Sequence, residues 1–371
     1  MIPNPSTHPR ILFVTPEAAF IPEGTENRPN YTSAYTGSFG DFLAELISNL
    51  FELGADVHVA QPDFRKIFAI RSRKEKAGVN VKLPCDRVHL AEDRAIFYSK
   101  PINSNSEWEN IKISLAFQRE VINQIVPRVQ PDLIHCYDWM TGLIPAAARK
   151  FKFPCLFTVQ KFDTARSLLS YVEDTGIDAA GFWENLFYER YPGSYEQTRD
   201  TNPLDLLLSG ILAANHVNTA SPVLLPNIAE GRSDYIYSPL GQVLAQKWKA
   251  GCACEIPGPP HIGLNPTSNK KLYCSYRPKN HHAGNHKKDR AKRQSISSSD
   301  NRTTAQRYID LYETILQRPL AATVHQKART IKKNSHTKIS DGQAIPYRKA
   351  RSTQSYPLPN ELISTPAMAS I

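Results

Sequence analysis

Apolar runs and amphipathic segments alternate along the first 260 residues of this chain. Ile11–Thr15 is a short apolar run typical of a buried strand, and Asp41–Leu53 then places apolar residues at helical spacing until Gly54. The pattern predicts further strands at Asp56–Gln61, Val79–Leu83, Ala95–Tyr98, Asp132–His135, Cys155–Val159 and His216–Ala220, and helices at Ser106–Val126, Gly142–Lys150, Ala179–Tyr188 and Pro203–Ala214. This order predicts an α/β protein with a doubly wound, mostly parallel Rossmann-like sheet.

The periodic pattern ends near Gly258, where Pro, Asn, Ser, His and Lys become dominant. We therefore expect residues 1–258 to form the α/β domain and residues 259–303 to form a basic linker of low order. Apolar spacing returns once, which predicts a terminal helix over residues 304–317. Residues 318–371 are polar and basic, and we expect them to be a disordered tail.

The formal net charge of +10 comes from the carboxyl-terminal part of the chain. Residues 261–371 hold 20 Lys and Arg against 6 Asp and Glu, whereas residues 1–260 hold 25 against 29. The run Lys287–Arg293 is of a kind that gathers nucleic-acid phosphates by releasing counterions. No stacking platform or recognition module accompanies it, so we favour a solvated linker, and nucleic-acid binding through the basic tail stays the less favoured alternative.

The cysteines and the absence of export or membrane signals favour a reducing, cytoplasmic setting. The chain opens with Met-Ile-Pro-Asn-Pro, and no run approaches the ~18 apolar residues that span a bilayer. Six scattered cysteines fit free thiols better than a disulfide framework. The spacing of Cys252, Cys254 and Cys274, even with His281, His282 and His286 nearby, fits no common structural zinc pattern, so we expect neither a metal nor another cofactor.

Candidate site residues follow three of the predicted strands. The segments Thr15–Glu17, His135–Trp139 and Val159–Lys161 would meet at the carboxyl edge of a parallel sheet, where such folds bind ligands. A glycine-bearing turn with Tyr35, Gly37 and Ser38 opens the first long helix. It is either a phosphate-binding turn, because its backbone N–H groups are free, or simply a tight strand-to-helix connection.

Several ordered stretches together resemble the amino-terminal half of bacterial glycogen synthase and plant starch synthase. They are Arg10-Ile-Leu-Phe-Val-Thr-Pro-Glu17, Gly37-Ser-Phe-Gly-Asp41, Phe51-Glu-Leu-Gly-Ala-Asp-Val-His-Val-Ala60, Gln130-Pro-Asp-Leu-Ile-His-Cys-Tyr-Asp-Trp139 and Val217-Asn-Thr-Ala-Ser-Pro222. The resemblance implies a retaining glucosyltransferase that moves glucose from ADP-glucose to an α-1,4-glucan in a cleft between two Rossmann-like domains. The second, donor-binding domain has no counterpart here, and residues 304–317 resemble the family's last helix, which returns to the first domain.

This sequence departs from the family pattern at the positions that meet the donor. Tyr35-Thr-Gly-Ser38 stands where the family has Lys-x-Gly-Gly, and a tyrosine does not supply the lysine's positive charge. Asp138 and Trp139 are retained from the family's sugar pocket, although two neighbouring histidines are not. Gln160 replaces a histidine near the transferring glucose, and an amide cannot exchange a proton near neutral pH.

By resemblance, we expect Glu17, Tyr35, Gly37, Ser38, Asp138 and Trp139 to contact sugar or phosphate, with Asp138 as the candidate catalytic residue. The alternative to a ligand contact is that Glu17 is a solvated loop carboxylate and that Trp139 belongs to the core. ADP-glucose and an α-glucan are the implied ligands, and catalysis is expected to be impaired. Three other interpretations stay open. The chain is a non-catalytic glucan-binding or regulatory remnant, a partner of a full-length synthase or of a separate donor-domain chain, or a decayed gene product.

Overall fold

The computed structural model describes residues 9–17, 37–64, 83–99, 105–220, 223–232, 236, 238–256 and 287–318. All of these belong to one compact unit, Met1–Ala328. Their centre is a seven-stranded sheet in the order β3-β2-β1-β4-β5-β8-β9, in which every neighbouring pair is parallel. The strands are β1 (Arg10–Val14), β2 (Asp56–Pro62), β3 (Val88–Ala91), β4 (Leu133–Tyr137), β5 (Cys155–Val159), β8 (His216–Thr219) and β9 (Ala253–Glu255).

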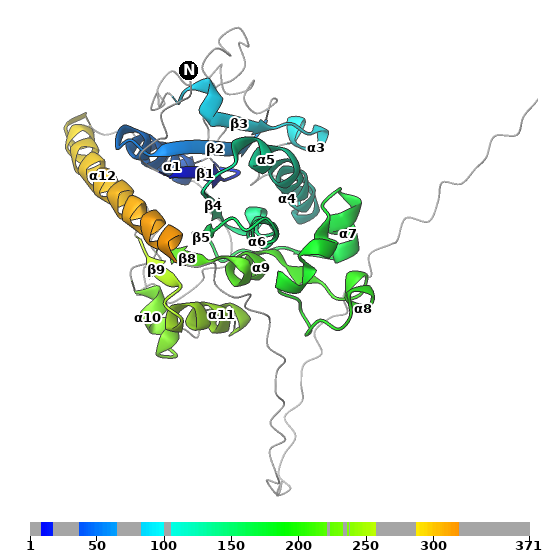
Figure 1. The fold of residues 1–371 in the computed structure, drawn as a ribbon. Coiled ribbons are helices and arrows are strands. Elements are labelled where there is room, and N and C mark those ends of the chain that lie inside the picture. Colours follow the sequence, from blue (N-terminus) through cyan, green and yellow to red (C-terminus); the bar gives the residue numbers. More distant parts are fainter. Residues whose placement is uncertain are drawn as a thin grey trace, which may run out of the picture. The chain divides into compact units, whose positions relative to one another are not determined.

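Helices cover both faces of this sheet, which confirms the predicted doubly wound α/β class (Figure 1). One face carries α1 (Gly37–Glu52) and α12 (Lys287–Gln317), and the other carries α4 (Glu107–Glu120), α5 (Val126–Val129), α6 (Ile144–Lys150) and α9 (Leu206–Ala213). The remaining helices are α3 (Arg94–Phe97), α7 (Leu169–Asp174), α8 (Tyr195–Arg199), α10 (Leu224–Ala229) and α11 (Ser238–Lys249). A short antiparallel pair, β6 (Arg166–Ser167) with β7 (Leu204–Asp205), lies outside the main sheet.

Local sequence signals explain where several helices begin and end. Ser106 caps α4 by accepting from the Glu109 N–H, and the Glu109 carboxylate accepts from the Ser106 N–H in return. Gly54 ends α1 with a φ of 89°, a left-handed conformation that glycine adopts without steric cost. The predicted long helix at Ser106–Val126 is present, but it contains a π-helical segment at Val121–Ile125 before α5.

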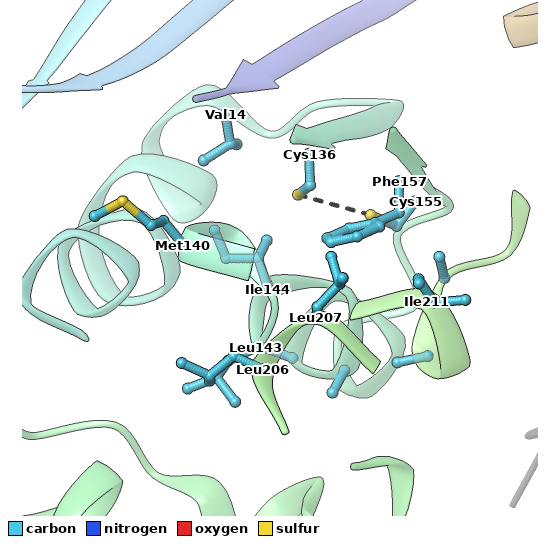
Figure 2. Close-up of a cluster of buried hydrophobic side chains, with 14 of the residues drawn as sticks. Val14, Cys136, Met140, Leu143, Ile144, Cys155, Phe157, Leu206, Leu207 and Ile211 are labelled. Carbon is cyan, nitrogen blue, oxygen red and sulfur yellow. Dashed lines mark hydrogen bonds between the residues drawn. The ribbon is translucent and has the colours of Figure 1, made fainter. Parts of the chain in front are cut away.

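The core between β4, β5 and the helices of the second face is apolar and closely packed (Figure 2). Gly142 and Gly210 allow this packing: a Cβ on Gly142 would lie 1.9 Å from the Leu206 carbonyl oxygen, and one on Gly210 would lie 2.5 Å from the Phe157 ring. Cys136 and Cys155 face each other across the two strands with their Sγ atoms 3.8 Å apart, and both are free thiols.

On the other face, α12 is anchored to the sheet by two buried tyrosines. The Tyr312 hydroxyl lies 2.8 Å from His135 Nδ1, and the Tyr308 hydroxyl accepts from Asn218 Nδ2 at 2.9 Å. Burial lowers the pKa of His135 well below its usual value, so the ring is neutral. Its second nitrogen lies 2.7 Å from Thr158 Oγ1, and the two hydroxyls satisfy both ring nitrogens.

Some predicted elements are wrong. Ala95–Tyr98 is not a strand, because Asp93 caps a helical turn there by accepting from the Ala95 N–H; the strand of this region is β3. Ala179–Tyr188 is not a continuous helix but two 3-10 turns, Ala179–Gly181 and Trp183–Asn185. The predicted helix at Pro203–Ala214 starts only at Leu206, because Leu204–Asp205 forms β7 and Asp205 is the N-cap.

Two further boundaries differ from the sequence prediction. The terminal helix begins at Lys287 and not at Thr304, so the last part of the expected linker is helical. Of the strand predicted at Val79–Leu83, only Leu83 lies within the described residues, and it is not in a strand.

Candidate functional site

The loops that follow β1, β4 and β5 come together at the carboxyl edge of the sheet. One oxygen of Asp138, just after β4, accepts from the backbone N–H groups of Gln160 at 2.7 Å and Lys161 at 3.1 Å. The Lys161 ammonium in turn lies 2.6 Å from the Glu17 carboxylate, which follows β1. Strand order reverses between β1 and β4, and this is the position where open α/β sheets place their ligands.

Asp138 has both an unfavourable backbone conformation and an unfavourable environment for its charge. Its φ of 55° with ψ of −179° is a conformation that side-chain-bearing residues rarely adopt and that costs about 1–3 kcal/mol. The residue is also buried, and burial, together with the Glu17 charge, raises the pKa of Asp138 to about 7 despite the opposing backbone N–H groups and Lys161. Thr141 fixes the turn by donating to the carbonyl oxygens of Tyr137 and Asp138.

The Glu17–Lys161 pair sets the charge balance of the site. Burial lowers the pKa of Lys161, but the Glu17 carboxylate outweighs it and raises that pKa overall. Lys161 is the one cationic side chain in the described residues of the three loops, and it is already paired. With Asp138 and Glu17 both present, these loops carry no uncompensated positive charge for a diphosphate.

Buried polar groups without partners mark the same edge. Neither polar atom of the Gln160 side chain is exposed, and neither makes a hydrogen bond within the described part of the chain. Thr219 Oγ1 is in the same condition, and its residue pairs with Val159, immediately before Gln160. Such groups cost free energy when they are left unsatisfied.

The other expected site residues do not all lie at this edge of the sheet. Trp139 opens the 3-10 turn at Trp139–Thr141 and packs, partly buried, against the core, which agrees with its structural interpretation. Gly37 and Ser38 are the first two residues of α1, so the predicted turn does lead directly into a helix amino terminus. Tyr35 lies outside the described residues.

Lys161 was not among the expected contact residues, although it stands next to Gln160 at the predicted edge. The signal that identifies it is electrostatic: a lone lysine beside two carboxylates at converging strand ends. In the described ranges, no group of three or more His, Cys, Asp or Glu side chains is arranged to hold a metal ion. None of the helices described there is long and apolar enough to cross a bilayer.

The fold and the edge residues together define a Rossmann-like α/β domain with polar side chains gathered at the β1/β4 switch point. A family model for the starch synthase catalytic domain matches residues 10–235. The chain therefore belongs to the starch synthase catalytic domain family.

Individual relatives agree with this assignment. The chain is 25% identical over 239 residues to a glycogen synthase of Cellvibrio japonicus, a match that covers 57% of this chain and 45% of the relative. It is 27% identical over 250 residues to a glycogen synthase of Deinococcus deserti, covering 60% and 52%. The chain thus spans about half the length of these glycogen synthases.

A solved structure, the catalytic domain of starch synthase IV from Arabidopsis thaliana bound to ADP and acarbose, aligns with a TM-score of 0.47 at 15% identity. That alignment covers 68% of this chain and 52% of the other.

Proposed function

We propose that this chain is the acceptor-side half of a glycogen/starch synthase-type glucosyltransferase, and that its crevice binds a glucose unit of an α-1,4-glucan without transferring glucose from ADP-glucose by itself. The observation that carries the proposal is the unpartnered side chain of Gln160 beside a charge-compensated Glu17–Lys161 pair. Such a site suits a neutral, hydroxyl-rich ligand and does not suit a diphosphate.

The groups of the crevice fit sugar hydroxyls one by one. The buried Asp138 carboxyl group can accept a hydrogen bond from a hydroxyl, and the Gln160 amide offers both a donor and an acceptor. A buried site that is built for hydrogen bonding rejects ligands that lack the matching groups, because its own polar atoms then remain unpaired.

Transfer of glucose needs more than this crevice provides. Developing charge on the leaving diphosphate must be stabilised by cations or N–H donors fixed in a closed cleft. The 31 residues between β9 and α12 are too few for a second lobe of the size of the first, since independent domains run to roughly 50–250 residues. Turnover would require a donor lobe from outside this interval, and a separate polypeptide is one source of it.

The test pairs a binding assay with an activity assay. Glycogen co-sedimentation should retain the wild-type chain, and Q160L should lose retention by about tenfold because leucine fills the volume but makes no hydrogen bond. The matched control is Q246L at an exposed position of α11. Labelled glucose from ADP-glucose should not enter glycogen when the chain is present alone, and robust incorporation would refute the claim that the chain is inactive by itself. Equal retention of Q160L and the wild type on glycogen would refute the claim that Gln160 binds the glucan.

A further inference from the structure

Lys161 contacts two carboxyl groups, one through its side chain and one through its backbone. Its ammonium nitrogen lies 2.6 Å from Glu17 Oε1, and its backbone N–H donates to Asp138 Oδ1 at 3.1 Å. No ion pair joins the ammonium group to Asp138, although both residues belong to the described part of the chain. The positive charge of Lys161 is therefore paired with Glu17 and not with Asp138.

The two carboxyl oxygens of Asp138 differ in what they contact. Oδ1 accepts from the backbone N–H groups of Gln160 and Lys161. Oδ2 makes no hydrogen bond within the described ranges, yet it is not one of the fully enclosed polar atoms that lack a partner, so it keeps contact with solvent. The residue as a whole is 8% exposed. Oδ2 is therefore the Asp138 oxygen that a ligand can reach.

A proton on Asp138 resides on Oδ2. Oδ1 already accepts from two N–H groups, and a hydroxyl hydrogen on that oxygen would point toward them. Burial raises the pKa of Asp138 to about 7, and the Glu17 charge adds to the rise, whereas the two N–H groups and the Lys161 ammonium oppose it. Below about pH 7 the side chain is thus a neutral acid whose O–H group lies at the accessible oxygen.

Glu17 keeps this acid neutral in two ways. Its own negative charge disfavours a second carboxylate nearby, and it holds the ammonium group that would otherwise stabilise an ionised Asp138. In the described residues, two further titratable groups belong to this cluster. Burial raises the pKa of Tyr137 well above its usual value, so its hydroxyl stays neutral, and the Asp163 charge acts on Lys161. Neither of them supplies a cation to Asp138.

A neutral acid suits the oxygens of a glucan that carry no hydrogen. The ring and glycosidic oxygens accept hydrogen bonds but cannot donate them, so a carboxylic O–H group can bond to them and a carboxylate cannot. With Asp138 protonated, the charges of Glu17 and Lys161 sum to zero, which suits an uncharged ligand. The same site with an ionised Asp138 carries one net negative charge and has lost its donor.

We propose that Glu17 acts as a positioning residue: it holds the Lys161 ammonium group away from Asp138, so that Asp138 donates its Oδ2 hydrogen to an acceptor oxygen of the α-glucan at neutral and acidic pH. This inference rests on the glucan-binding function proposed above and adds a pH-dependent control of the same site. The only covalent change is the loss of the Asp138 proton to solvent as the pH rises.

Isothermal titration of the full chain with maltotriose, an α-1,4-linked glucan fragment, tests the donor role at several pH values and constant ionic strength. The affinity should be about tenfold weaker at about pH 8 than at about pH 6, because the protonated fraction of Asp138 falls from ~90% to ~10%. D138N should abolish this pH dependence, since an amide does not titrate in that range. A wild-type affinity that does not change with pH, or an unchanged pH dependence in D138N, would overturn the proposal.

E17Q tests the positioning role. Its affinity for maltotriose should fall at a lower pH than that of the wild type, whereas E196Q, at an exposed position of α8, should follow the wild type. Carboxyl ¹³C NMR of the ligand-free chain gives a second readout, with the Asp138 signal assigned by its loss in D138N. E17Q should lower the pKa of Asp138, and an unchanged pKa would also overturn the proposal. Failure of maltotriose to bind at any pH refutes the glucan function and the donor role with it, whereas binding that does not depend on pH overturns the donor role alone.

Discussion

The Lys161 ammonium lies 2.6 Å from the Glu17 carboxylate and joins the loop after β5 to the loop after β1 across the intervening β4. Both side chains are partly exposed, at 41% and 20%, so the pair contributes little to stability. Its main effect is electrostatic, because the Glu17 carboxylate neutralises the charge of the Lys161 ammonium at this edge of the sheet.

The first prediction concerns this neutralisation. E17Q should strengthen binding of ADP to the chain about fivefold, because removal of one charge beside Lys161 is worth ~1 kcal/mol at a partly exposed site. Equilibrium dialysis with labelled ADP measures the change. E196Q, at an exposed position on α8, is the control, and an ADP affinity that E17Q leaves unchanged would show that the pair does not limit phosphate binding.

The second prediction concerns pH. The pKa of Asp138 rises from 3.8 to about 7 on folding, so the folded state holds its proton more tightly than the unfolded state. The free energy of unfolding should therefore fall as pH rises from about 4 to 7, by roughly 1 kcal/mol per pH unit from this residue. D138N should remove that slope in urea denaturation at several pH values; parallel curves for wild type and D138N would contradict the burial argument.

The third prediction concerns the anchor of α12. Y312F removes the hydroxyl that lies 2.8 Å from His135 Nδ1 and leaves a buried ring nitrogen unpaired. The free energy of unfolding should drop by about 1–3 kcal/mol. Y191F, at a side chain that is 56% exposed, should change it little in the same chemical denaturation experiment. An unchanged free energy of unfolding in Y312F would mean that the Tyr312 hydroxyl does not stabilise the docking of α12.

The fourth prediction compares two glycine-to-alanine changes. G142A puts a methyl group into the Leu206 carbonyl and should destabilise the protein by about 3 kcal/mol, measured as a lower Tm. G241A meets only Ile236 Cγ2 at 3.9 Å, within α11, and should stabilise by about 0.5–1 kcal/mol. Equal effects of the two changes would show that backbone approach at Gly142 is not what selects glycine there.

Much of the sheet could be predicted because it depends on local signals. Apolar runs such as Cys155–Val159 mark buried strands, and parallel topology then dictates that the residues after β1, β4 and β5 share an edge. The meeting of Glu17, Asp138 and Lys161 follows from that rule without knowledge of any side-chain distance.

What could not be predicted depends on contacts between distant residues or on capping chemistry. Asp93 turns an apolar segment into a helix by one hydrogen bond, which outweighs the strand-like composition of Ala95–Tyr98. The pairing of His135 with Tyr312 joins residues 177 positions apart. The stacking of His58 on His89 depends on the register of two strands, and β3 itself was not predicted.

The anchoring of α12 also orders events during synthesis. Tyr308 and Tyr312 fill the core beneath them only after the ribosome has made about 50 residues beyond β9, which at ~5–20 residues per second takes roughly 3–10 seconds. Until then the apolar sheet face lacks the cover of α12, which includes the Tyr312 ring against Phe13. Chaperones that recognise apolar surface can therefore bind this polypeptide only until α12 docks onto the sheet.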